Sequence, residues 1–158
     1  MNVTIRKARP DDIAGIHRLM REFAEFEKLL EYFRVTEQRL ADVLFGDEAF
    51  VECLVAQSGD DLCGYAIFYP NFATFSGERG LYLEDIYIER ARRGGGLGRA
   101  LLGEIARTAL ERGLERIDFQ VLDWNVPAIG FYRDLGAVAN DGETHFKFGS
   151  EALARLAG

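Results

Sequence analysis

A strand pattern, a glycine-rich stretch and a helix pattern follow one another directly between residues 81 and 112. The segment LYLEDIYIE (81–89) is typical of a strand, and apolar residues from Leu97 onward recur at helical spacing. Between them lies RRGGGLG (92–98), where glycine lets the backbone take positive φ and approach a ligand closely. The free N–H groups and the dipole of a helix N-terminus suit a phosphate group. This order predicts either a flexible surface turn or a phosphate-binding loop.

The remaining segments predict a mixed α+β fold. Two strands joined by SGDD (58–61) are expected to form a hairpin, and strand–helix–strand crossovers follow in the second half. The expected strands are 3–8, 50–57, 62–70, 81–89, 115–124 and 144–149, and the expected helices are 13 to about 28–30, 36–45, 97–112 and 127–137. Because no repeat or linker interrupts this order, we expect one domain over residues 1–158.

Composition and charge restrict the classes of function. The chain has 158 residues and a net charge of −7, which argues against a nucleic-acid partner and suits a cationic small molecule. No apolar run approaches the roughly 18 residues of a membrane span, and no signal sequence is evident, so we expect a cytoplasmic protein without a membrane partner. Cys53 and Cys63 are expected to be buried free thiols, and His17 and His145 are too few to indicate a metal site.

Two common phosphate-binding motifs do not fit the glycine stretch. A Walker loop requires Gly-Lys-Ser/Thr, whereas Leu97-Gly98-Arg99 stands here. A dinucleotide-binding fingerprint follows the first strand of a βαβ unit with GxGxxG spacing, whereas two hairpin strands precede this stretch. The phosphate-loop interpretation therefore needs another pattern.

The stretch Arg93–Gly98 resembles the Q/R-x-x-G-x-G/A signature of the GNAT N-acetyltransferases. A second block, WNVPAIGFYRDLGA (124–137), resembles the family's asparagine followed by a short helix ending in Phe-Tyr. Segments such as FAEFEK (23–28), GYAIFY (64–69) and LYLED (81–85) resemble the diamine branch, which includes spermidine/spermine and thialysine acetyltransferases. The resemblance implies a strongly twisted, mostly antiparallel sheet of six to seven strands with about four flanking helices. It also implies acetyl-CoA as the cofactor, a small-molecule amine as the substrate and no metal.

The chemistry implied by the resemblance is acetyl transfer to a primary amine by direct transfer in a ternary complex. An aliphatic amine has a pKa of about 10.4 and must lose a proton before it attacks. Glu84 is the candidate base, because the family's substrate-contacting acid stands at this place in LYLED. Tyr132 is the candidate acid that protonates the departing thiolate, although packing beside Phe131 is an alternative role.

The resemblance also assigns cofactor contacts. The family has a bulge in the strand before the glycine loop, which implies that backbone groups of Ile86, Tyr87 and Ile88 meet the pantetheine and the thioester oxygen. The glycine loop and the start of the next helix are assigned to the pyrophosphate, and the second block to further contacts. The assigned residues are Ile86, Tyr87, Ile88, Arg93, Gly94, Gly95, Gly96, Leu97, Gly98, Arg99, Asn125, Ala128 and Tyr132.

Candidate substrate-binding residues are Phe26, Glu27, Glu84 and Asp85. Glu27 extends the apolar face of the first helix near its C-terminus, where burial and the helix dipole both disfavour a carboxylate. A cation pocket accounts for this position, and a salt bridge to Arg21 or Lys28 is the alternative. Asp85 faces away from Glu84 on an ideal strand, so the two reach one pocket only if a bulge intervenes.

Three functions remain open at this point. The first is acetylation of a polyamine, diamine or lysine-like amine; the second keeps the chemistry with an aminoglycoside, another amine or a protein N-terminus as acceptor. The third is a sensor that binds acyl-CoA without catalysis. The segment 30–33 adds bulk, and GETHF (142–146) lacks a family tryptophan, so the branch pattern does not define the amine. The family resemblance further implies a homodimer.

Overall fold

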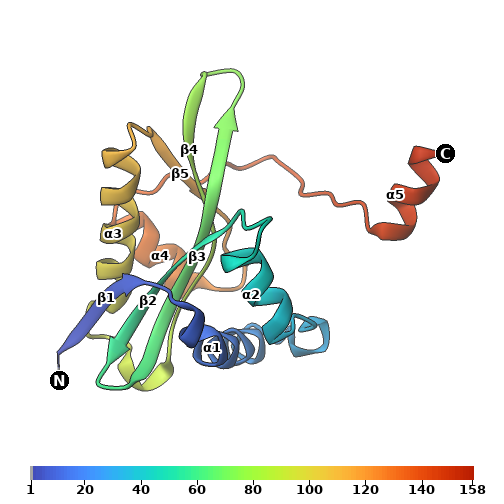
Figure 1. Cartoon of the computed structure of the whole chain (residues 1–158). Coiled ribbons are helices and arrows are strands. Elements are labelled where there is room, and N and C mark those ends of the chain that lie inside the picture. The colour runs from blue at the N-terminus through green and yellow to red at the C-terminus, as the bar shows by residue number, and fades with distance from the viewer. Residues whose placement is uncertain (1) are drawn as a thin grey trace. The chain divides into compact units, whose positions relative to one another are not determined.

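The computed structural model describes residues 2–158, which form two compact units divided after Gln120 (Figure 1). The first unit contains a sheet and three α-helices. Its strands are β1 (Val3–Lys7), β2 (Glu52–Ser58), β3 (Asp61–Ala73), β4 (Glu78–Ile88) and β5 (Arg116–Phe119). Its helices are α1 (Ile13–Phe26), α2 (Glu37–Phe45) and α3 (Leu97–Glu111), with 3-10 turns at Pro10–Asp12, Leu30–Tyr32 and Arg90–Arg92.

The sheet has the order β1-β2-β3-β4-β5, with antiparallel neighbours except for the parallel pair β4 and β5. The predicted hairpin is confirmed, because β2 and β3 are joined across Gly59, whose φ of 63° lies in the left-handed region that glycine tolerates. The final strand, β5, pairs only with residues 80–83 of β4. Within residues 2–158 the second half of β4 therefore has no strand on that side.

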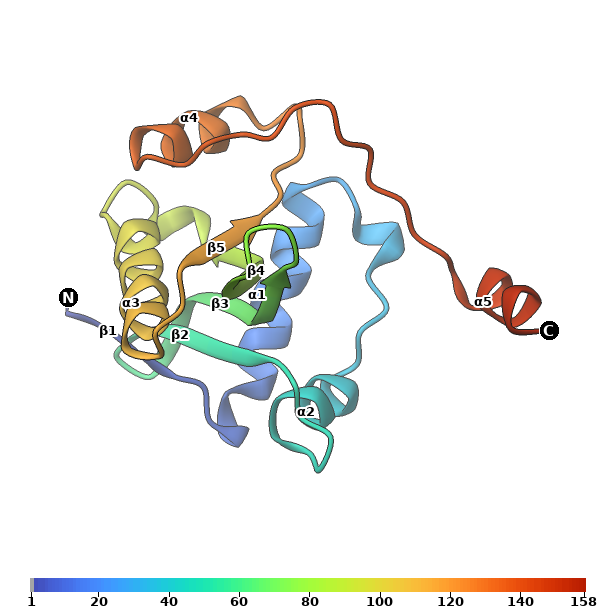
Figure 2. The same cartoon turned by 90° about the horizontal axis from the view of Figure 1, so that it is seen from above.

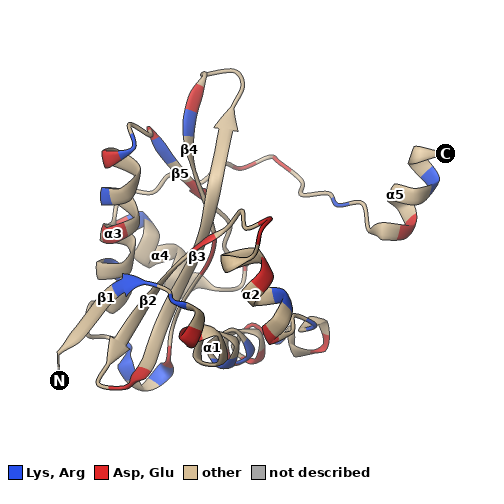
Figure 3. Ribbon diagram, in the orientation of Figure 1, with Lys and Arg blue, Asp and Glu red and all other residues tan. Residues whose placement is uncertain are grey.

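Helices cover both faces of this sheet (Figure 2). On one face α1 and α2 pack on side chains such as Val55, Tyr65 and Tyr87. On the other face α3 packs on a second apolar cluster that includes Leu54, Phe68 and Leu83. The two clusters follow from the alternation of side chains along each strand, which buries both faces of the sheet. Along α3 basic and acidic residues alternate on the exposed side (Figure 3).

The second unit contains α4 (Val126–Asp134) and α5 (Ser150–Ala157), joined by a segment without helix or strand (Figure 1). The prediction of a strand at 144–149 is wrong, as is the extension of β5 to residue 124. Alternating side chains do not form a strand unless a neighbour pairs with the backbone groups. The sheet described over residues 2–158 accordingly has five strands, and five α-helices replace the expected four. Among these residues no helix combines the length and apolar character needed to cross a membrane.

Candidate active site

A bulge in β4 turns two consecutive carboxylates toward the same face of the sheet. Asp85 pairs with Ile67 and Leu83 pairs with Phe68, so Glu84 is the extra residue and opposes no partner. Leu83 and Ile86 both belong to the cluster on the α3 face. The two residues between them therefore lie on the α1 face, and the bulge that the sequence analysis required is present.

Tyrosine hydroxyls hold both carboxylates. The Tyr69 hydroxyl donates to Glu84 Oε2 at 2.9 Å, and the Tyr65 hydroxyl donates to Asp85 Oδ2 at 3.1 Å. Burial and the bond to Glu84 raise the pKa of Tyr69 to about 12, and burial holds the pKa of Tyr65 well above its ordinary value. Sequence reasoning missed both tyrosines. Tyr65 and Tyr69 are four residues apart, which places both side chains on the same face of a strand. This spacing is the sequence signal by which they could have been found.

The end of α1 brings a third carboxylate to this face. Burial, together with the charge of Asp85, raises the pKa of Glu27. Burial also raises the pKa of Asp85 to about 6, although the Tyr65 bond opposes this shift. Within residues 2–120 no lysine or arginine forms an ion pair with Glu27, and the guanidinium of Arg21 instead lies 5.9 Å from the ring centroid of Phe33. The site therefore concentrates negative charge, which a bound cation would compensate.

The backbone conformation of Lys28 explains why α1 ends with Glu27 at its C-cap. Helix α1 ends at Phe26, and Lys28 has a φ of 60°, which is rare for a residue other than glycine. The Leu29 N–H then donates to the Ala24 carbonyl at 2.8 Å and closes the last turn. The left-handed residue ends α1 abruptly and leaves Glu27 as its C-cap beside the sheet.

The unpaired edge of β4 presents backbone groups of two predicted cofactor contacts. The Glu89 N–H donates to the Cys63 carbonyl of β3 at 2.9 Å. Backbone groups alternate along a strand, so those of Tyr87 also face β3, whereas those of Ile86 and Ile88 face the edge beyond β5. A contact between Tyr87 and a cofactor would thus have to come from its side chain. Ile86 and Ile88 have the backbone orientation that the prediction requires.

The glycine loop turns the chain from β4 into α3. Gly94 and Gly96 have φ values of 83° and 81°, and Gly96 is the N-cap of α3 without a side-chain cap. The first bond within the helix runs from the Ala100 N–H to the Gly96 carbonyl. The N–H groups of Leu97, Gly98 and Arg99 precede it and are suited to bind an anion. Gly95 does not have a positive φ.

Arg93 contacts the end of α1 rather than pointing away from the protein. Its guanidinium carbon lies 4.5 Å from the ring centroid of Phe26 and 5.3 Å from that of Tyr87, and its Nε donates to the Ile88 carbonyl at 3.0 Å. The ring of Tyr87 also stacks on the ring of Phe23, with the two ring centroids 5.2 Å apart. The structure thus brings the predicted substrate residue Phe26 and the predicted cofactor residue Arg93 together.

The second predicted block lies in the second unit. The Asn125 side chain caps α4 by accepting the Ala128 N–H at 3.4 Å, and the rings of Phe131 and Tyr132 meet edge to face at 5.2 Å. Pro127 within the first turn supports this short helix. The cofactor contacts assigned to Asn125, Ala128 and Tyr132, and the role of Tyr132 as general acid, remain predictions.

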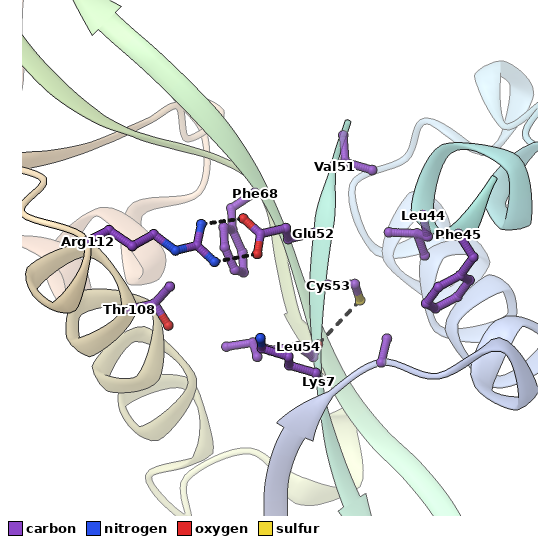
Figure 4. A pocket seen from close by; sticks show the side chains of 11 residues that line it. Lys7, Leu44, Phe45, Val51, Glu52, Cys53, Leu54, Phe68, Thr108 and Arg112 are labelled. Carbon is purple, nitrogen blue, oxygen red and sulfur yellow. Dashed lines mark hydrogen bonds and ion pairs between the residues drawn. The ribbon is translucent and has the colours of Figure 1, made fainter. Parts of the chain in front are cut away.

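A separate cavity of about 150 Å³ contains none of the predicted site residues (Figure 4). It lies among the end of β1, the start of β2 and the last turn of α3. There the Arg112 guanidinium donates to both carboxylate oxygens of Glu52 at 2.6 Å, which lowers the pKa of Glu52 (Figure 4). Glu52 and Arg112 thus neutralise each other there, and Lys7 is the other charged residue of the lining. The carboxylate face near β4 is the stronger candidate for chemistry.

The cysteines and His17, for which no site role is predicted, have structural environments. Cys53 and Cys63 are free and buried, as predicted, and burial raises the pKa of Cys53 to about 12. Among residues 2–158 no group of three or more histidine, cysteine, aspartate or glutamate side chains is arranged to hold a metal. His17 instead contacts the Val35 carbonyl at 2.7 Å and the ring of Phe33.

Strand β4 is bulged and has an open edge, and a glycine loop and the uncapped start of α3 follow it. These features define the class of acyltransferases that the sequence resembles. The sequence pattern of the Acetyltransferase (GNAT) family matches residues 13–137. The chain therefore belongs to the GNAT acetyltransferase family, and it is an N-acetyltransferase.

Relatives of known activity match the predicted branch. The chain is 37% identical to thialysine N-epsilon-acetyltransferase of Sus scrofa, in an alignment that covers 99% of this chain and 98% of the relative. It is 32% identical to L-ornithine N5-acetyltransferase of Arabidopsis thaliana, with 84% of this chain and 78% of the relative covered. The fold is similar to that of an integron cassette protein of V. cholerae, with a TM-score of 0.81, 23% identity, and 99% and 98% of the two chains covered.

Proposed function

We propose that this enzyme transfers the acetyl group of acetyl-CoA to a primary amine of a small cationic substrate, directly and in a ternary complex. The observation that carries the proposal is the convergence of Glu27, Glu84 and Asp85 on one face of the sheet, beside the open edge of β4. Three carboxylates without a basic partner in the first unit favour a substrate with more than one positive charge. The thialysine and ornithine acetyltransferases to which the chain is similar support the same class of amine.

The chain offers a group for each contact with acetyl-CoA. The free N–H groups of Leu97, Gly98 and Arg99 would hold the pyrophosphate. Gly94 and Gly96, whose positive φ favours glycine, place no side chain in its approach. Backbone groups of Ile86 and Ile88 along the edge of β4 would hold the pantetheine arm. When bound, acetyl-CoA supplies the activated acetyl group as a thioester.

Glu84 would remove a proton before the acetyl transfer, and Tyr132 would supply one after it. Glu84, held by Tyr69, would accept the proton of the substrate ammonium directly or through one water and would leave a neutral amine that can attack the thioester. The Ile86 or Ile88 N–H would be placed to donate to the thioester oxygen. Tyr132 would donate its proton to the departing thiolate and would be reprotonated by the second proton that the amine nitrogen loses as the amide forms. Because Cys53 and Cys63 are buried with raised pKa values, neither is suited to carry the acetyl group, which supports direct transfer.

Asp85 and Glu27 would bind the part of the substrate that does not react. A second ammonium group near these two carboxylates would favour their charged forms and offset their mutual repulsion. The ring of Phe26, which precedes Glu27 in the chain, would contact the aliphatic chain of the amine. A diamine, a polyamine or a lysine-like amine meets these requirements, and a simple monoamine, with its single positive charge, does not.

We further propose a cytoplasmic homodimer with a single domain over residues 1–158. Reduced, buried cysteines support the compartment. Support for the dimer comes from the second unit, which exposes large apolar side chains that a partner would cover. These are Val138, Phe146, Phe148, Leu153 and Leu156.

The experiment is a thiol-release assay with acetyl-CoA across polyamines, ornithine, lysine, thialysine, aminoglycosides and simple monoamines. We expect turnover with dicationic amines. For monoamines kcat/KM should be at least tenfold lower, because about tenfold is the effect of losing one charged contact. Acetyl-CoA should also raise the melting temperature of the protein. A protein that acetyl-CoA stabilises but that acetylates none of these amines would be a sensor, and the proposed function would be wrong.

A further inference from the structure

We propose that Tyr65 and Tyr69 of β3 are positioning residues that hold Asp85 and Glu84, respectively, in the orientation that the reaction uses. This inference rests on the proposed function, because the two carboxylates matter only if they bind and deprotonate the amine. Neither tyrosine needs to contact the substrate. Their hydroxyl groups act through the carboxylates to which they donate.

The register of β3 and β4 explains why two tyrosines can act on two neighbouring carboxylates. Tyr65 pairs with Tyr87, which lies two residues after Asp85, and Tyr69 pairs with Tyr82, which lies two residues before Glu84. The carboxylates therefore lie between the two tyrosines along the sheet. Each hydroxyl reaches the nearer carboxylate across a diagonal of the ladder, a distance that an aromatic side chain spans.

The bulge creates the need for these bonds. In a regular strand Glu84 and Asp85 would point to opposite faces, whereas here two adjacent like charges share one face. Their repulsion would turn the carboxyl groups apart unless other groups hold them. The hydroxyl donors at 2.9 and 3.1 Å act on opposite sides of the pair and oppose that rotation.

Tyr65 has a second consequence for Asp85. The ionisable groups that act on Asp85 or respond to its charge are Glu27 from α1, Cys53 from β2, Tyr65 from β3 and Glu84 from β4. All four are acids, so their ionised forms disfavour a charged Asp85. The Tyr65 hydroxyl is the neutral donor among them, and its bond favours the carboxylate form.

Packing alone does not account for the Tyr65 hydroxyl. The side chain is fully buried in the cluster beneath α1, where a phenylalanine would fill the same space without a polar atom. A buried hydroxyl needs a partner, and Asp85 is the partner found. Tyr69 is partly exposed, so its hydroxyl could turn to water but donates to Glu84 instead.

The test compares Tyr65→Phe and Tyr69→Phe with the matched control Tyr82→Phe. Tyr82 lies on the same face and stacks on Tyr69 at 5.4 Å, and its hydroxyl holds neither carboxylate. The titration of the Asp85 carboxyl carbon is followed by NMR in the absence of substrate, and the pH profile of kcat/KM is measured with a diamine. Melting temperatures verify that each variant is folded.

We expect Tyr65→Phe to raise the pKa of Asp85 by about one unit and to move the acidic limb of the kcat/KM profile upward by a similar amount. Tyr69→Phe should lower the plateau of kcat/KM about tenfold and leave the Asp85 titration in place. Tyr82→Phe should change neither. An unchanged Asp85 titration in Tyr65→Phe, or a Tyr69→Phe plateau equal to that of Tyr82→Phe, would overturn the proposal.

One outcome separates this inference from the proposed function. If the Asp85 titration shifts in Tyr65→Phe while the pH profile stays where it is, Tyr65 does hold Asp85. In that case the proposed role of Asp85 in amine binding is wrong. Tyr69→Phe, at a partly exposed position, provides a second and independent test.

Discussion

Glu84 and Asp85 are consecutive in the chain, yet both side chains lie on the face of the sheet that carries α1. The bulge at Glu84 produces this arrangement, because it adds one residue to β4 without a partner in β3. Glu84 stays exposed, whereas Asp85 is largely buried, and burial raises the pKa of Asp85 to about 6. A base and a cation-binding group can therefore stand side by side.

The buried carboxylate makes the protein without substrate less stable at neutral pH. Its pKa is raised from 3.8 to about 6, so below pH 3.8 the folded and unfolded states are both protonated there. As the pH rises from 3.8 to about 6, the unfolded state loses this proton first and stability falls; above pH 6 the loss is constant. We expect Asp85→Asn to increase the free energy of unfolding by about 2–3 kcal/mol at pH 8, since one pKa unit corresponds to about 1.4 kcal/mol.

Urea denaturation of both proteins between pH 4 and pH 8 provides the measurement. The gain should shrink as the pH approaches 4, and a saturating diamine should reduce it at pH 8 by stabilising the natural protein. A gain that is equal at all pH values would show that packing, rather than the charge of Asp85, is responsible.

Glu27→Gln should weaken binding of dicationic amines without slowing the chemical step. Loss of one charged contact predicts a rise in KM of about tenfold with kcat nearly unchanged. Steady-state kinetics with a diamine and with a monoamine of equal length measure the effect. The matched control is Glu25→Gln, an exposed position on the same helix, whose kinetic constants should stay at their natural values.

The glycines of the loop should differ sharply in their tolerance of a side chain. At Gly96 an alanine would have to adopt a φ near 81°, which costs about 1–2 kcal/mol of stability. At Gly95 a Cβ atom would meet nothing closer than the Arg92 carbonyl oxygen at 3.8 Å, without positive φ. Urea denaturation of Gly96→Ala and Gly95→Ala measures the contrast, and equal losses of stability would contradict the loop conformation.

Tyr132→Phe tests the proposed general acid. Removal of the proton donor should lower kcat by about 100-fold at neutral pH, the lower range for general acid catalysis, with little change in KM. Tyr32→Phe, at an exposed position in the loop after α1, serves as the control and should keep full turnover. If Tyr132→Phe also turns over at the natural rate, another group protonates the thiolate.

Much of the fold could be predicted from local patterns. Helix α2 begins after its N-cap Thr36 and α3 begins after Gly96, as expected from capping residues and apolar spacing. The strand expected at 144–149 failed for a physical reason, because strand formation depends on a distant partner that the segment itself does not encode. Helix α5 was missed because its eight residues make only about two turns, too short a window for its apolar residues to establish a helical period.

The sequence by itself determined the family, the glycine loop and the candidate carboxylates, because these depend on residue types at short spacing along the chain. Tertiary structure alone decided how those groups face one another. The bulge at Glu84, the hydroxyls of Tyr65 and Tyr69, and the contact of Arg93 with Phe26 all join segments distant in the sequence. Their geometry follows from the register between strands and the packing of α1 on the sheet, and a shift of one residue in that register would turn the same side chains to the opposite face.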